Sequence, residues 1–141
     1  MPGGKFIDTN IWVYAHLRAP EEPRHAIAFE FTSNLTDGMI SPQVAAEYYS
    51  VMLRSGQSDA WIQENLDAVL SYVRLQPLDE AVLRRAWEIR NRFGFSFWDS
   101  QIVAAALEAQ CDVLYTEDLQ NGQVIEGLTV VNPFADVKQG T

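Results

Sequence analysis

The sequence is poor in the residues that bind soft metals or form cross-links. Its 141 residues include one cysteine, Cys111, and two histidines, His16 and His25. A single cysteine excludes an intramolecular disulfide and any zinc site built on cysteine pairs. The two histidines lie nine residues apart without partner cysteines, so no zinc-binding spacing is present. A metal site in this chain would therefore use oxygen ligands.

Long apolar segments and basic residues are also scarce. The apolar runs are far shorter than a membrane-spanning helix, and residues 1–7 (MPGGKFI) lack the layout of a signal peptide. We therefore expect a cytoplasmic protein with no membrane segment. Ten basic residues against 19 acidic ones give a net charge of -9, which argues against nucleic-acid binding over a broad basic face. A local basic patch, or acidic residues whose charge is offset by bound metal, stays open.

Short apolar segments alternate with helical patterns along the chain. Strands are predicted at 5–7, 38–40, 75–77 and 113–116, with an edge strand at 128–131. Helices are predicted at 11–17, 24–36 and 43–53, from Ser58 onward, over the segment that ends at Gly94, and from Ser96 onward. This alternation is typical of a parallel sheet with helices on its faces. The length fits one domain spanning residues 1–141.

Three apolar segments carry a single carboxylate each. Asp8 is the only charge in FIDTNIWVYA, Glu47 in VAAEYYSVML, and Asp99 in FSFWDSQIVAAAL. A fourth acidic group, Glu117-Asp118, follows the strand predicted at 113–116. A carboxylate in an apolar setting is costly unless a partner compensates it. The candidate partners are a helix terminus, a cationic side chain and a metal ion.

Chain topology is expected to bring these carboxylates together. Ligands of a parallel α/β sheet bind at the carboxyl edge of its strands. Asp8 and Asp118 follow strands, and Glu47 and Asp99 lie near the starts of helices at the same edge. Clustered carboxylates raise one another's pKa, and no basic residue falls within the three apolar segments. Mg²⁺ or Mn²⁺ suits such oxygen ligands and can activate water for phosphodiester cleavage, so the pattern indicates a nuclease site.

The segments FIDTNIWVYA, the Glu47 helix, FWDSQIVAAAL and LYTEDL resemble, in order, the four motif regions of the PIN-domain ribonucleases. The spacing is similar to that of the VapC toxins of toxin–antitoxin pairs, over residues from about Lys5 to Pro133. The resemblance implies a three-layer α/β/α sandwich with a short parallel sheet. It also implies a Mg²⁺- or Mn²⁺-dependent endoribonuclease that cleaves an RNA substrate, dimerises, and is inhibited by an antitoxin whose tail enters the active-site groove.

The resemblance also assigns residues to the site. The acidic cluster that binds metal and performs catalysis would be Asp8, Glu47, Asp99 and Asp118. The polar pair Thr9 and Asn10 follows the first aspartate and would help to hold the pocket, and Thr116 matches the Ser/Thr two residues before the last aspartate. Glu117 adjoins Asp118 and could share its role, although Asp118 fits the motif better.

Each acidic residue also has a purely structural interpretation. Asp8 could cap the helix that follows it, and Ser96-x-x-Asp99 fits a capping-box-like pattern. Glu47 could form a salt bridge, with Arg54 or another arginine, and Asp118 could be a solvated turn residue. Their occurrence together at one sheet edge favours a functional site.

Clustered arginines and the tryptophans allow two interpretations each. Four of the ten basic residues lie within nine positions: Arg84, Arg85, Arg90 and Arg92. A solvated helix face with a Glu88 pair is the default, and contact of Arg85 and Arg92 with RNA phosphates is the alternative. Core or dimer-interface positions are favoured over base stacking for Trp12, Trp61, Trp87 and Trp98.

Two other functions compete with a nuclease. A phosphatase or phosphotransfer domain would use Asp-x-Asp, or an aspartate with a strand-end lysine. Here the first motif is Asp8-Thr-Asn10, and Lys5 and Lys138 lie outside the expected pocket. A catalytically inactive PIN-like module that binds RNA or protein predicts loss of an acidic position, and none is missing. The sequence therefore favours a metal-dependent endoribonuclease, with the inactive module as the alternative.

Overall fold

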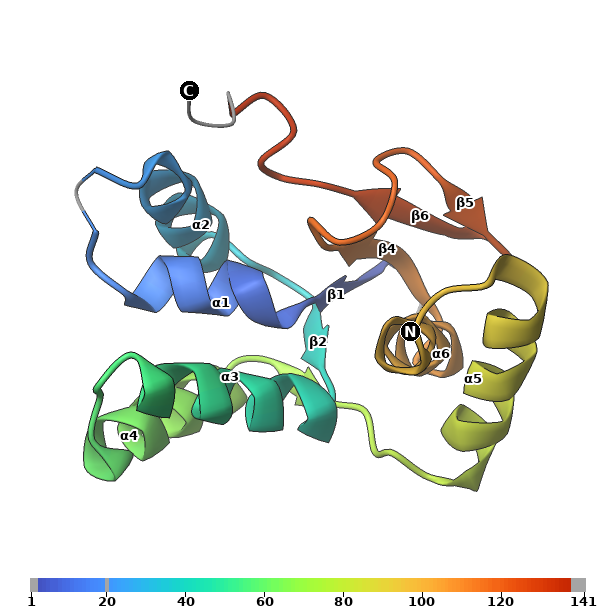
Figure 1. The fold of residues 1–141 in the computed structure, drawn as a ribbon, viewed down its shortest axis with the longest axis horizontal. Helices are drawn as coiled ribbons and strands as arrows, with labels where there is room; N and C mark the ends of the chain where they lie inside the picture. Colours follow the sequence, from blue (N-terminus) through green and yellow to red (C-terminus); the bar gives the residue numbers. More distant parts are fainter. Residues whose placement is uncertain (1–2, 20, 138–141) are drawn as a thin grey trace.

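A mixed sheet runs through the centre of the protein (Figure 1). The computed structural model describes residues 3–19 and 21–137, and in these residues six strands form one sheet. In order across the sheet they are β3 (Arg74–Leu75), β2 (Gly38–Ile40), β1 (Gly4–Ile7), β4 (Cys111–Tyr115), β6 (Leu128–Val131) and β5 (Val124–Ile125). Neighbouring strands are parallel except for the antiparallel β5–β6 pair.

Helices cover both faces of this sheet. On one side lie α1 (Thr9–His16), α2 (Pro23–Ser33), α3 (Pro42–Arg54) and α4 (Asp59–Leu70), and on the other α5 (Glu80–Phe93) and α6 (Phe97–Glu108) (Figure 1). Right-handed crossovers produce this division, because the chain moves outward from β1 to β3 and then returns to β4. The predicted α/β/α sandwich is confirmed. In the described part of the chain, no helix has the length and apolar character needed to cross a membrane.

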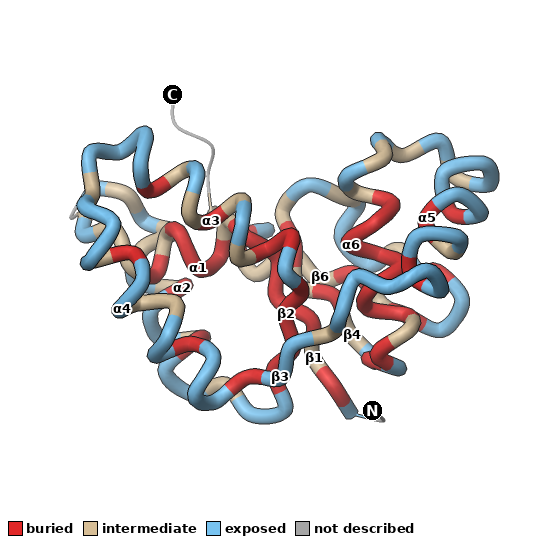
Figure 2. The backbone as a smooth tube through the Cα atoms, turned by 90° about the horizontal axis from the view of Figure 1, so that it is seen from below, coloured by how far each residue is buried: buried red, intermediate tan, exposed pale blue. Residues whose placement is uncertain are grey.

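The core explains the apolar composition of the central segments. Phe6 and Ile7 of β1 and Leu114 of β4 are fully buried, and buried residues continue through α6 (Figure 2). Every residue of α6 from Ser100 to Leu107 is buried. A helix that is apolar around its whole circumference is expected where both sides are covered, and α6 lies between the sheet and α5 (Figure 1). The two ends of α6, with Asp99 at the start and Glu108 at the finish, approach the surface.

Several boundaries differ from the prediction at polar residues and at a proline. Helix α1 begins at Thr9 rather than 11, because Asp8 is its N-cap. Helix α2 ends at Ser33 rather than 36. The third strand covers 74–75 rather than 75–77. Its pairing with β2 stops after the Gln76 amide donates to the Ile40 carbonyl at 2.8 Å, because the next residue, Pro77, has no N–H to donate.

The prediction that 128–131 forms an edge strand is wrong. Strand β5 pairs outside β6 and forms the edge. The two strands are joined by Glu126 and Gly127, whose φ angles are 50° and 89°. Positive φ at both central residues is the mark of a type I′ hairpin, which Asn-Gly or Asp-Gly usually signals. The Glu-Gly pair used here concealed the hairpin.

Two N-cap serines allow a test of what fixes the helix starts. Ser96 Oγ accepts a hydrogen bond from the Asp99 amide at 3.1 Å, whereas Ser41, before α3, makes no side-chain cap bond and its buried hydroxyl has no partner in residues 3–19 and 21–137. We expect Ser96→Ala to lower the free energy of unfolding by about 1 kcal/mol, because it leaves a helix N–H unsatisfied.

Ser41→Ala is the matched control. It removes a hydroxyl that makes no hydrogen bond in the described residues, so we expect the free energy of unfolding to change by less than about 0.5 kcal/mol. Urea unfolding of both variants in EDTA measures the difference. Equal losses in the two variants would contradict this account of the caps.

Candidate functional site

Polar side chains gather at the carboxyl ends of the central strands. The chain passes from β1 to β2 and β3, then returns to β4 on the other side of β1. Such a reversal of strand order creates the crevice in which open α/β sheets bind ligands. Asp8 directly follows β1, and Thr116 directly follows β4. Both residues therefore lie at the point where strand order reverses.

Asp8 is the most deeply placed carboxylate of this site, with 6% of its surface exposed. Its Oδ1 accepts a hydrogen bond from the Thr9 amide at 2.7 Å, and its Oδ2 accepts one from Thr116 Oγ1 at 2.8 Å. Thr116 Oγ1 in turn accepts from the Asp118 amide at 3.1 Å. Asp8 does cap α1, as its structural interpretation holds, but the cap uses one oxygen only. The other oxygen joins the end of β1 to the loop that carries Asp118.

Glu47 reaches the site from α3. Its Oε2 accepts from Thr9 Oγ1 at 2.9 Å, and its Oε1 accepts from Gln43 Nε2 at 2.8 Å. The salt bridge considered for this residue is not formed with Arg54, which donates to Ser50 Oγ instead. Thr9 therefore links two carboxylates, Asp8 through its amide and Glu47 through its hydroxyl.

Gln43 and Gln101 are two functional neighbours that the sequence analysis missed. Gln43 Nε2 donates to the Trp98 carbonyl at 3.1 Å as well as to Glu47, and Gln101 Nε2 donates to Gln43 Oε1 at 2.7 Å. This chain of amides ties α3 to the start of α6, where Asp99 lies. The i, i+4 spacing of Gln43 and Glu47 was a usable signal, because such residues are neighbours on a helix.

Burial, together with neighbouring acidic charges, raises the pKa of Asp8, Asp99 and Asp118. Burial raises the pKa of Asp8 from 3.8 to about 7, the Asp118 and Glu47 charges add to that rise, and the hydrogen bonds from Thr116 and Thr9 oppose it. Desolvation and the charges of Asp118 and Glu47 raise the pKa of Asp99. Desolvation raises that of Asp118, followed by the Glu117 and Glu47 charges. No cationic side chain is among these influences, so ionisation of these carboxyl groups is disfavoured rather than stabilised by a counter-charge.

The donor chemistry of this cluster fits a hard divalent cation. Its ligating atoms are carboxylate oxygens, which Mg²⁺ and Mn²⁺ prefer. Asp99 is the third residue of α6, where the helix terminus also favours a negative charge. In residues 3–19 and 21–137, no three Asp, Glu, His or Cys side chains already converge on one point.

Glu117 has different surroundings from Asp118. Its Oε1 accepts from Asn10 Nδ2 at 3.1 Å and from the Tyr14 hydroxyl at 3.2 Å, and its Oε2 lies 3.5 Å from Arg24 Nε. Asn10 thus holds Glu117 beside the cluster. Arg24 offsets the charge of Glu117, whereas no cationic side chain in the described residues does so for Asp118, so the two adjacent acids are not equivalent. The Arg24 pairing had no signal in the sequence, since its partner lies at the other end of the chain.

Arg85 and Arg92 lie on α5 in ion pairs. Glu126 lies 3.1 Å from Arg85 and 2.8 Å from Arg92, and Arg85 also approaches Glu108 at 3.5 Å. Glu108 ends α6, about 14 Å along the helix from Asp99. The ion-paired interpretation therefore describes these arginines, with Glu126 and Glu108 in place of Glu88. Their contact with RNA stays an untested prediction.

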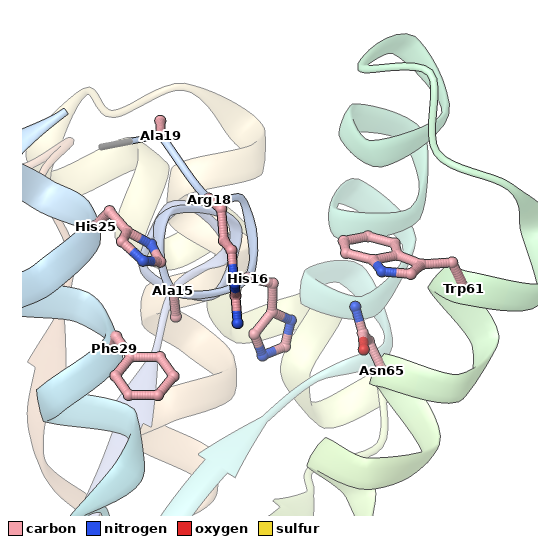
Figure 3. Close-up of a pocket in the computed structure, with 8 residues that line it drawn as sticks. All are labelled: Ala15, His16, Arg18, Ala19, His25, Phe29, Trp61 and Asn65. Atoms are coloured by element: carbon pink, nitrogen blue, oxygen red, sulfur yellow. The ribbon is translucent and has the colours of Figure 1, made fainter. Parts of the chain in front are cut away.

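A second pocket lies at the other end of α1, between α2 and α4 (Figure 3). His16 Nδ1 is 2.6 Å from the Tyr48 hydroxyl, and His25 Nδ1 is 2.8 Å from the Tyr14 carbonyl oxygen. Burial lowers the pKa of His16. The pocket has a volume of about 570 Å³ and its lining includes no carboxylate. It is therefore separate from the acidic cluster.

Known proteins share this architecture. The model of the PIN domain family matches residues 5–124. VapC20 of Mycobacterium tuberculosis, a sarcin-ricin loop cleaving toxin, is 20% identical, with a TM-score of 0.67 over 82% of this chain and 92% of that one. A toxin–antitoxin complex from Klebsiella pneumoniae is 18% identical, with a TM-score of 0.70 over 92% and 98%. VapBC-1 from nontypeable Haemophilus influenzae is 20% identical, with a TM-score of 0.66 over 94% and 98%. Comparison with curated proteins gave no match.

The raised pKa of Asp8 predicts an inverted dependence of stability on pH. The folded protein binds the Asp8 proton more tightly than the unfolded chain does. The contribution of this proton to the free energy of unfolding is therefore complete below pH 3.8 and is lost as the pH rises toward about 7. Asn at position 8 can still cap α1 but cannot ionise. In EDTA, we expect wild type to lose on the order of 2 kcal/mol relative to Asp8→Asn between about pH 4 and about pH 8.

Urea unfolding of both proteins at the two pH values gives this difference. Asp67→Asn, at an exposed position on α4, is the control. Its free energy of unfolding should differ from that of wild type by the same amount at both pH values. A gap between wild type and Asp8→Asn that does not change with pH would show that the Asp8 carboxylate is not destabilising.

Proposed function

Because this chain belongs to the PIN domain family, we propose that it is a metal-dependent endoribonuclease, the toxin of a toxin–antitoxin pair. The proposal is carried by one observation: where the strand order reverses, burial and acidic neighbours raise the pKa values of Asp8, Asp99 and Asp118, and no cationic side chain of the described residues is among the causes. A merely structural set of acids would be paired with arginine or lysine, as Glu117 is with Arg24.

Asp8, Glu47, Asp99 and Asp118 would hold Mg²⁺ or Mn²⁺, directly or through water. When bound there, the cation would activate water and neutralise phosphate charge in hydrolysis of an RNA phosphodiester. The residues around the cluster prepare these ligands. Thr116 orients Asp8 and the loop of Asp118, while Thr9 and Gln43 between them engage both oxygens of Glu47. Such supporting hydrogen bonds fix the direction of ligand lone pairs before an ion arrives.

The proposed mechanism also reconciles an RNA substrate with a net charge of -9. An acidic surface repels phosphates generally, so productive approach is confined to the place where bound cations reverse the local charge. The carboxylates would thus serve twice, as ligands and as the reason that RNA is bound only where it can be cut.

A protein partner forms part of the proposal. The Klebsiella pneumoniae structure is a toxin–antitoxin complex, and on this analogy of fold we propose a cognate antitoxin for this chain. Homodimerisation and a cytoplasmic location stay predictions. Light scattering of the purified chain, alone and with the product of a neighbouring antitoxin-like gene, tests both associations. If the chain is monomeric and does not bind the antitoxin-like protein, both proposed associations are wrong.

Cleavage should require the metal and the carboxylates together. We expect purified protein to cut a pool of total RNA and tRNA with Mn²⁺ or Mg²⁺ and not with EDTA. Asp8→Asn, Asp99→Asn and Asp118→Asn should each lower the cleavage rate by at least about 100-fold, the scale on which one member of a catalytic unit contributes. Gel or fluorescence assays of cleaved ends measure the rates.

Matched variants separate a lost ligand from a lost charge. Asp67→Asn on α4 removes one negative charge away from the site and should leave the rate unchanged within about twofold. Glu117→Gln should retain far more activity than Asp118→Asn, because Glu117 is already occupied by Arg24, Asn10 and Tyr14. Cutting that survives EDTA, or that survives Asp99→Asn, would sink the proposed mechanism. No cutting, together with no metal-dependent thermal stabilisation, would favour the inactive PIN-like module.

A further inference from the structure

A groove opens beside the acidic cluster, between the first turns of α3 and α6. Its lining includes Glu47 and Gln43 from α3, Trp98 and Gln101 from α6, and Leu78 from the loop before α5. The volume is about 520 Å³. Glu47 belongs to both the groove and the carboxylate cluster, so a molecule bound in the groove adjoins the proposed cleavage site.

Trp98 is the unusual member of this lining. Trp12 lies in the core with 2% of its surface exposed, as predicted, whereas Trp98 is 60% exposed and does not belong to the core. Its ring meets Phe97 edge-on at 5.2 Å, and its carbonyl accepts a hydrogen bond from Gln43. An aromatic ring held in this way, next in the chain to Asp99, offers a prepared surface for another flat ring.

The polar groups of the groove have defined donor and acceptor roles. The Gln43 amide donates to Glu47 and to the Trp98 carbonyl, both of which only accept, so its oxygen is left to accept from Gln101. Within the described residues, Gln101 Oε1 and the hydroxyl proton of Ser50 then have no partner, since Ser50 Oγ accepts from Arg54. The groove thus combines an aromatic ring with one free acceptor and one free donor, which suits the edge of a nucleobase.

No basic side chain lines this groove. Several arginines of the described chain are engaged elsewhere, among them Arg24 with Glu22 and Glu117, and Arg84 with Glu80. Among the residues that line the groove, affinity for RNA therefore has to come from groups other than cationic side chains. Stacking of bases on aromatic side chains is the alternative source in proteins that bind single strands.

We propose that this groove binds the base of a nucleotide next to the scissile phosphate, stacked on Trp98 and contacted at its edge by Gln101 and Ser50. The proposal rests on the nuclease function proposed above and adds the requirement that the RNA be single-stranded there, because a paired base cannot enter. It makes Trp98 a binding residue of the substrate site.

The test uses a short RNA that the wild-type protein cleaves, in an intact form and in a form abasic at the nucleotide beside the cut. We expect Trp98→Ala to lower kcat/KM on the intact RNA by about 10-fold or more, and Trp98→Phe to retain most of it. Wild type should cut the abasic RNA more slowly than the intact RNA. Trp98→Ala should cut the two RNAs at the same rate, because the ring and the base act as one pair and removing either removes the interaction. Trp87→Ala, also at an exposed tryptophan but on α5, is the matched control and should keep wild-type kcat/KM.

Two results would overturn the groove proposal while the nuclease stands. One is that Trp98→Ala leaves kcat/KM unchanged, or that the losses in kcat/KM from Trp98→Ala and from removing the base simply add. The other is loss of an oligomer in Trp98→Ala, seen by light scattering, which would assign the groove to contact between two copies. If wild type cleaves no RNA, the nuclease proposal fails. Fluorescence polarisation of labelled single-stranded oligonucleotides, titrated with the intact protein, then tests separately whether the groove binds a base. Weaker binding by Trp98→Ala than by Trp87→Ala would support it, and equal binding would overturn it.

Discussion

The burial of one carboxylate, Asp8, constrains the edge of the sheet at which the acidic residues lie. A charged group at such a position must be held by hydrogen bonds or by a counter-ion, and here two hydrogen bonds hold it without a cation. The first fixes where α1 begins, and the second fixes how the chain leaves β4. Because Thr9 also bonds Glu47, the position of α3 depends on the same residue pair. Strain of this kind is tolerated where the rest of the fold is stable, and it is typical of functional sites.

Around that carboxylate, neutral and charged side chains have different effects on the acids. Threonine hydroxyls and glutamine amides orient the acids without cancelling their charge, whereas Arg24 cancels the charge of Glu117. The difference separates two acids that are adjacent in the chain. It confines the acidic groups without a cationic partner, within the described residues, to those beside the crevice.

The sequence was sufficient for the features that depend on periodicity and on isolated charges. Alternating apolar strands and helical patterns indicated a parallel sheet with helices on its faces, and acids at the ends of elements indicated that they would lie at one edge, while the α/β/α sandwich came from the resemblance to the PIN family. What it could not provide are pairings between distant residues, such as Arg24 with Glu117 or Gln43 with Gln101, because these depend on packing and not on local spacing. The Glu126-Gly127 hairpin was missed because its turn residues are atypical. For Trp98 a core or dimer-interface position was predicted, and its exposure rules out the core.

The two edge strands of the sheet are short and expose few unpaired backbone N–H and C=O groups. Strands β3 and β5 contain two residues each, and pairing beyond β3 meets Pro77 almost at once. A sheet whose outer strands display so few free N–H and C=O groups is a poor template for addition of a strand from a neighbouring chain. For a protein that is 48% hydrophobic, this geometry favours solubility during synthesis and storage, since growth of aggregates by edge-to-edge pairing has almost no starting point.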